Sequence, residues 1–174
     1  IVYARDALLG DLGAVIHTLR ERTGIAHWVG SVGMGVLGVS VATSGPTAYT
    51  GVADEYFAVP ALSILTMRVP PEAFRLIPAQ RTEEADFGAE GDDWLAVSQP
   101  AIGLVHADPR HENLGELIGD LAERTGYLVG GLSSAQGTMP VIADDIEEGV
   151  ASGVLFAPGL GIHTSLTQGC TPIG

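Results

Sequence analysis

Three glycine-rich stretches carry most of the side chains that could bind or transform a small molecule. Each one combines glycines with serines or with Cys170, the single cysteine. Glycine lets a ligand approach the backbone closely, and a serine hydroxyl both donates and accepts hydrogen bonds. Alternatively, these glycines only allow tight turns and close strand packing. The candidate ligand-binding residues are Gly30 and Ser31; Gly130, Gly131, Ser133 and Ser134; and Gln168, Gly169 and Cys170.

Cys170 could also act as a nucleophile or a redox sensor, because it is flanked by glycine on a turn-like segment. It could equally be a small buried residue that fits a tight turn. A reactive thiol needs a base, and the sequence alone does not tell which histidine lies near the sulfur. A thiol-dependent hydrolase or transferase is therefore kept as the alternative to ligand binding, and no catalytic residue is predicted. The candidate bases are His17, His27, His106, His111 and His163.

The sequence gives little support to a cofactor or metal site. Residues 30–35 lack the lysine and the hydroxyl residue that end a phosphate-binding loop, and the G-x-G-x-x-G match at 33–38 leads into a strand-like run. His106, Asp108 and His111 lack further ligands of an obvious metal set, so we favour a strand histidine and a loop histidine. The acidic run at 144–148 lacks the spacing of a calcium loop and is expected to be a solvated strand edge. We expect no cofactor.

Composition limits the classes of partner. The 174 residues are 46% hydrophobic, which suffices for one domain with a sizeable core. The formal net charge of −13 disfavours nucleic acid and anionic membranes. No apolar run is long enough to span a bilayer, no signal peptide is visible, and a single cysteine allows no intrachain disulfide. We expect a cytoplasmic protein. Because the chain starts at Ile1 and stops at Gly174, we also expect it to be part of a longer protein.

The elements that position these residues follow from an internal repeat. Segments 12–35 and 114–137 share ten identities in 24 ungapped positions, where chance gives roughly two. The identities include Glu21-Arg22-Thr23-Gly24 with Glu123-Arg124-Thr125-Gly126, and Ser31 with Ser133. The sequence therefore predicts two copies of one unit, offset by 102 residues.

Each unit is expected to be strand, helix, strand. Short apolar runs at 1–4 and 101–107 predict buried strands, and apolar residues at helical spacing follow Asp11 and Asn113. Gly24 and Gly126 stand where left-handed helix caps belong. Apolar strands at 26–29 and 127–132 come next, and each leads into a loop of glycine and serine. Ser31 and Ser133 would then lie on equivalent loops.

The rest of the chain predicts further strands around a connector. Strands are expected at 36–43, 47–51, 61–69, 139–143, 149–157 and 161–167, with a turn at 44–46. Residues 70–100 are expected to connect the copies, with a short helix at 72–76, and the two tryptophans to be core or interface anchors. The predicted class is α/β (α+β). Two pseudo-symmetric repeats, about 1–69 and 101–174, would form mixed sheets with helices on the outside.

The chain resembles the N-terminal part of the FIST domain. The resemblance rests on a strand ending at Asp108, on Val129-Gly130-Gly131-Leu132-Ser133-Ser134, and on the closing Gln168-Gly169-Cys170-Thr171-Pro172-Ile173-Gly174. The family commonly closes with S-Q-G-C-R-P-I-G. This chain has Leu166-Thr167 before Gln168 where a serine is frequent, and Thr171 in place of the arginine.

That resemblance implies a bacterial sensory input domain of signal transduction that binds small ligands such as amino acids. It also implies a FIST C-terminal domain or a downstream signalling module as partner, besides the small-molecule ligand. We expect the ligand where the Gly30 and Gly130 loops converge, with the two halves alike in structure and unequal in function. A scaffold that binds only protein partners remains an alternative.

Overall fold

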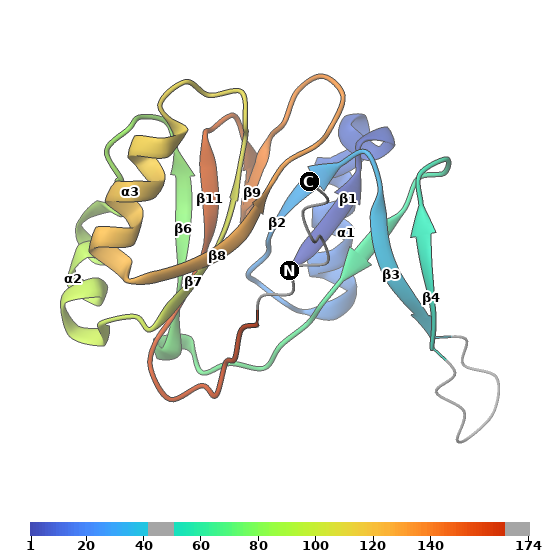
Figure 1. The fold of residues 1–174 in the computed structure, drawn as a ribbon. Coiled ribbons are helices and arrows are strands. Elements are labelled where there is room, and N and C mark those ends of the chain that lie inside the picture. Colours follow the sequence, from blue (N-terminus) through green and yellow to red (C-terminus); the bar gives the residue numbers. More distant parts are fainter. Residues whose placement is uncertain (42–50, 166–174) are drawn as a thin grey trace, which may run out of the picture.

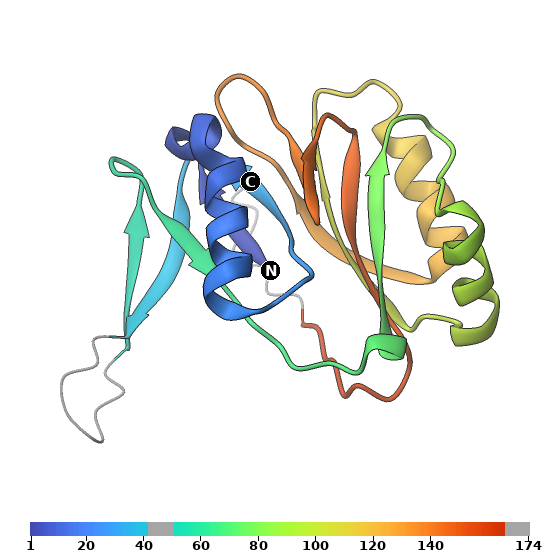
Figure 2. The same cartoon turned by 180° about the vertical axis from the view of Figure 1, so that it is seen from behind.

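The computed structural model describes residues 1–41 and 51–165, and within β3 and β4 it describes the side chains of residues 36–38 and 53–56. Two mixed sheets stand face to face, and the helices cover their outer faces (Figures 1 and 2). This confirms the expected class of mixed sheets with helices outside.

The first sheet has five strands in the order β10-β9-β2-β1-β5. β1 (Val2–Arg5) and β2 (Val29–Gly33) are parallel, whereas β5 (Leu62–Ile64), β9 (Val141–Ala143) and β10 (Asp145–Glu147) are antiparallel to their neighbours. Helix α1 (Leu12–Thr23) packs on its outer face, after a 3-10 helix, η1 (Asp6–Asp11). The buried residues of this layer include Val2, Leu12, Ile16, Trp28, Val32 and Ile142.

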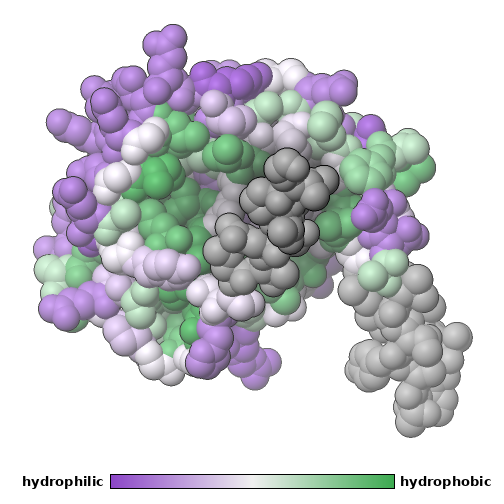
Figure 3. Space-filling model, in the orientation of Figure 1, coloured by the Kyte–Doolittle hydropathy of each residue, from purple (hydrophilic) through white to green (hydrophobic). Residues whose placement is uncertain are grey.

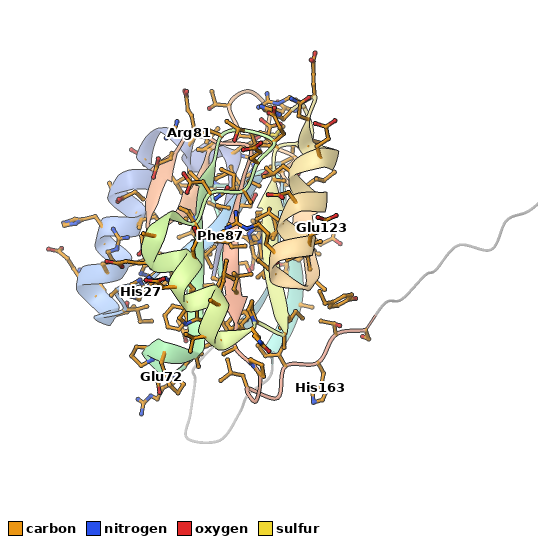
Figure 4. All side chains as sticks on the ribbon, turned by 90° about the vertical axis from the view of Figure 1, so that its left-hand side faces the viewer. His27, Glu72, Arg81, Phe87, Glu123 and His163 are labelled. Carbon is orange, nitrogen blue, oxygen red and sulfur yellow. The ribbon has the colours of Figure 1, made fainter. Side chains whose placement is uncertain are left out.

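The second sheet has four strands in the order β6-β11-β7-β8. β7 (Ile102–Ala107) and β8 (Tyr127–Leu132) are parallel, and β11 (Ala151–Phe156) joins them to β6 (Phe74–Gln80) by antiparallel pairing. Helices α2 (Gly88–Ser98) and α3 (Leu114–Thr125) cover its outer face. Figure 4 shows this layer from the outside, with Phe87 between the two helices and Glu123 on the solvent side. The remaining elements are η2 (Pro71–Ala73) and a two-stranded ribbon of β3 (Val36–Val41) and β4 (Gly51–Tyr56).

Strand periodicity decides which side chains meet between the sheets. On β1, Val2 and Ala4 are fully buried against α1, and Tyr3 points the other way. On β7, Val105 and Ala107 face α3, so Ile102, Leu104 and His106 face the first sheet. A third apolar cluster of Val29, Ile102, Val154 and Phe156 fills one part of this interior. The other part is a cleft.

Several expected boundaries were wrong. β2 starts at Val29, so Gly30 and Ser31 lie inside a strand and not on a loop. The expected strand at 127–132, by contrast, is confirmed as β8, which contains Gly130 and Gly131. The expected strand at 61–69 is limited to Leu62–Ile64, β4 begins at Gly51, and residues 161–165 are not in a strand. The predicted turn at 44–46 lies outside the described residues.

The expected connector supplies two structural elements. Residues 70–100 contribute β6, which pairs with β11, and α2, which covers the second sheet; the short helix at 72–76 is instead the 3-10 turn Pro71–Ala73. Pro78 interrupts the apolar run of β6, and a proline is tolerated there because β6 is an edge strand.

The helix ends were only partly predicted. Asp11 and Asn113 hold the N-cap positions, but neither side chain makes a capping hydrogen bond, because both backbones lie outside the extended conformation that capping requires. Gly24 is left-handed, as expected, at φ 70° and ψ 6°. Gly126 has a positive φ of 85° but a ψ of −136°, so it is not a left-handed cap.

Candidate functional site

The candidate site is a cleft of about 580 Å³ between the two sheets. That volume lies within the range of sites for small molecules. Its walls come from β1 and β2 on one side and from β7 and β8 on the other, with the start of β3 and Ser63 of β5 at the rim. On the face of the molecule shown in Figure 3, apolar residues gather in the middle, and hydrophilic residues border them on the side of α2 and α3.

Two serines join the walls of the two sheets. The hydroxyl oxygens of Ser31, on β2, and Ser133, directly after β8, lie 2.6 Å apart. Both residues are more than 90% buried, and the N–H of Ser133 donates to the carbonyl of Ala107 at 2.8 Å. The pair therefore forms a buried hydrogen bond between the predicted repeats, at positions that the sequence repeat had aligned.

A second polar contact crosses between the same sheets. His106 Nε2, on β7, lies 3.0 Å from the hydroxyl of Tyr3, on β1, and the two rings meet edge to face at 5.3 Å. His106 is 4% exposed, and its Nδ1 is buried without a hydrogen-bond partner among the described residues. Burial lowers the pKa of His106 to about 4, so the ring is neutral at neutral pH.

Of the predicted ligand-binding residues, the structure brings four to the cleft: Ser31, Gly130, Gly131 and Ser134. Ser133 lies behind Ser31 as its hydrogen-bond partner. Ser134 accepts a hydrogen bond from the N–H of Met34 at 3.4 Å. Gln168, Gly169 and Cys170 lie outside the described residues.

Gly30 and Gly130 have a structural role that does not need a ligand. A Cβ on Gly30 would lie 1.7 Å from the carbonyl oxygen of Val2, and one on Gly130 equally close to that of Val105. Neither position can hold a side chain without moving a strand. Gly131 has nothing within 4 Å of its Cβ position, so its missing side chain leaves open space in the cleft. The packing role of the glycines thus holds for two of these three positions.

Sequence reasoning missed Tyr3 and His106. His106 was interpreted as an ordinary strand histidine, and Tyr3 was not singled out. The available signal was a polar ring in a buried strand. Ile102, Leu104 and His106 occupy every second position and share the inner face, and His106 is the polar residue of the three. Among the described residues, no group of three metal-ligating side chains comes together.

A second pocket, of about 240 Å³, has a different character. Its lining is mainly apolar and includes Trp28, Phe74 and Phe156. The imidazole in its lining, His27, is already engaged, because its Nδ1 lies 2.9 Å from a carboxylate oxygen of Asp144. We therefore take the larger cleft, with its hydroxyl groups, as the candidate site.

Comparison with known protein families identifies the family of the chain. The family model of the FIST N domain matches residues 1–174. The chain therefore belongs to the FIST family, whose domains are sensory domains of signal transduction. Neither a curated protein nor a solved structure matches the chain. Among the described residues, no helix combines the length and the apolar character needed to cross a membrane.

Proposed function

We propose that the chain is the input domain of a bacterial, cytoplasmic signalling protein and binds a small polar ligand in the cleft between its two sheets. Amino acids and similar small polar metabolites are the first class to test. The observation that carries the proposal is the cleft itself, because polar side chains from both sheets meet there. A FIST C-terminal domain or a downstream signalling module would receive the signal.

The geometry favours binding over bond-making chemistry. Within the described residues, Ser31 and Ser133 bond to each other, Ser134 bonds to backbone, and the nitrogen of His106 that has a partner meets Tyr3. No serine hydroxyl is thus paired with a base in this part of the chain, as nucleophilic catalysis would require. The hydroxyls are placed to hold a ligand by hydrogen bonds.

A position between two sheets also suits a sensor. A ligand that contacts β1 and β2 on one side and β7 and β8 on the other stabilises one spacing of the two sheets. Such a ligand shifts the population towards that spacing, which is how binding becomes a signal.

Thermal unfolding with a panel of amino acids and metabolites tests the proposal. At a concentration of about 100 times Kd, a specific ligand adds about 2.7 kcal/mol, which raises Tm by roughly 5–10 °C for a chain of this size. The Ser134→Ala variant should show a smaller shift. Ser98→Ala, on α2 and outside the cleft, is the matched control. If no compound shifts Tm, in this chain or in a longer one that includes the C-terminal partner, the proposal fails.

A further inference from the structure

The hydrogen-bonding state of Tyr3 decides what the cleft can recognise. A neutral histidine carries one proton, on Nδ1 or on Nε2. If the proton were on Nδ1, a buried N–H would have no partner among residues 1–41 and 51–165, and orphaned buried N–H groups are rarer than orphaned acceptors. The proton therefore belongs on Nε2, which donates to the Tyr3 oxygen at 3.0 Å. The phenol proton of Tyr3 is then free to donate to a ligand.

The other hydroxyls of the cleft are in a similar state. Ser134 already accepts a hydrogen bond from the N–H of Met34, so its own proton is available. Ser31 and Ser133 share one hydrogen bond in which either hydroxyl can be the donor; when Ser133 donates, the proton of Ser31 is left for a ligand in the cleft. Tyr3 and Ser31 are register partners on neighbouring strands. The cleft thus presents several O–H donors within a short span.

None of the described residues lining the cleft is ionised. The lining consists of glycines, serines, aliphatic residues, Tyr3 and the neutral His106. Neither charged residue at the end of β1 is among the lining residues: Arg5, its last residue, donates to the carbonyl of Met34, and Asp6, directly after it, accepts from the N–H of Gln136. Burial raises the pKa of Tyr3, which keeps the phenol protonated. A ligand carboxylate would meet no cation among the described lining residues, in a chain whose formal net charge is −13.

We propose that the cleft recognises an uncharged carbonyl compound, best a carboxamide, whose oxygen accepts hydrogen bonds from Tyr3 and the cleft serines. The apolar lining from Val36, Leu104 and Val129 contacts the hydrocarbon part of the same ligand. This inference rests on the proposed function and narrows it. Within the polar metabolites, it selects molecules that place a neutral amide or carbonyl group, and not a carboxylate, in the cleft.

Matched probes that differ only in charge test this inference. N-acetyl-leucinamide and N-acetyl-leucine have nearly the same size, and one ends in a carboxamide and the other in a carboxylate. Isobutyramide and isobutyrate form a smaller pair. Titration calorimetry or ligand-observed NMR gives each affinity. We expect the amide of each pair to bind at least ten-fold more tightly, and the Tyr3→Phe variant to lose about ten-fold for the amide.

The control variant is Tyr127→Phe, which removes an exposed phenol from β8 outside the cleft lining and should leave the affinity unchanged. A carboxylate that binds as tightly as its amide overturns the inference and leaves the proposed function standing. A zwitterionic metabolite that binds when no amide binds likewise overturns the inference and leaves the proposed function standing. An amide that binds equally well to Tyr3→Phe overturns the role of Tyr3. If nothing binds, whatever its charge, both the inference and the proposed function fail.

Discussion

At the scale of single residues, His106 is the group most sensitive to pH. Its pKa in the folded protein is about 4, below the ordinary 6.5, because the ring is buried. Between these values the unfolded chain binds a proton that the folded protein does not, so the free energy of unfolding rises with pH across this window. The stability from His106 is complete above pH 6.5 and is lost as the pH falls towards 4.

We therefore predict that the wild-type protein loses about 3 kcal/mol of stability between pH 7 and pH 4 through His106, and that His106→Gln loses less. Urea unfolding at several pH values measures this. His17→Gln removes an exposed imidazole and is the matched control. Asp108 also contributes stability, because its hydrogen bond with Arg110 lowers its pKa. That contribution is lost at lower pH than the contribution of His106. Equal pH slopes for wild type and His106→Gln would refute the assignment.

The serine pair makes a second prediction at this scale. Ser31→Ala leaves the hydroxyl of Ser133 buried without its partner, so it should cost about 1–2 kcal/mol. The double variant Ser31→Ala, Ser133→Ala should cost less than the sum of the two single changes, because no orphaned hydroxyl remains. A double-mutant cycle by urea unfolding should give a coupling of about 1 kcal/mol. Strictly additive losses would contradict the pairing.

At the scale of elements, two strand glycines, one in each sheet, should respond differently to substitution. Gly30→Ala places a Cβ against the carbonyl of Val2, so β1 and β2 must separate, and we expect a loss of roughly 3 kcal/mol or more. Gly131→Ala meets nothing within 4 Å and should change stability by less than about 0.5 kcal/mol. It should nevertheless weaken ligand binding, because it narrows the cleft. Thermal unfolding of both variants checks the contrast, and a stable Gly30→Ala variant would refute it.

The same elements show what the sequence could and could not predict. The helix periodicity and the repeat identified α1 and α3, whose bounds differ by 102 residues, as the repeat predicted. The strand bounds did not follow from the sequence, because the buried residues 28–32 have no polar alternation to mark where pairing begins. β6 was missed because Pro78 and scattered polar residues hide its alternation.

The serines show why aligned positions need not be structurally equivalent. Ser31 pairs with Tyr3, 28 positions earlier, whereas Gly130 pairs with Val105, 25 positions earlier. The repeats differ in spacing on both sides of the helix: four residues, 25–28, separate Gly24 from β2, whereas β8 starts directly after Gly126, and β1 starts ten residues before α1, whereas β7 starts twelve before α3. By strand pairing and by sheet face, the counterpart of Ser31 is Gly131, because Ser31 pairs with Tyr3 and Gly131 with His106, and both pairs line the cleft. Ser133 is the residue that Ser31 contacts. Sequence alignment alone could not reveal that contact.

At the scale of the whole molecule, the two predicted repeats share their sheets. β9 and β10 come from the second repeat, yet they complete the sheet of the first through the pairing of β2 with β9. Asp144, between those strands, accepts a hydrogen bond from the backbone N–H of Trp28 at 2.9 Å. Ile142 is fully buried in the core that α1 covers.

Because β9 and β10 of the second repeat complete the sheet of the first, we predict that the first repeat does not fold alone. Residues 1–69 by themselves lack β9 and β10, so β2 becomes an open edge, and Trp28 and Val32 lose the cover of Ile142. We expect this fragment to show no cooperative thermal transition and to be digested rapidly by protease. Mixing it with residues 70–174 should restore a cooperative transition, since the second fragment supplies the missing strands. The variant Ile142→Asp in the second fragment is the control, because it should prevent recovery by placing a charge in the shared core. A cooperative transition of residues 1–69 alone would mean that the first repeat closes its own sheet.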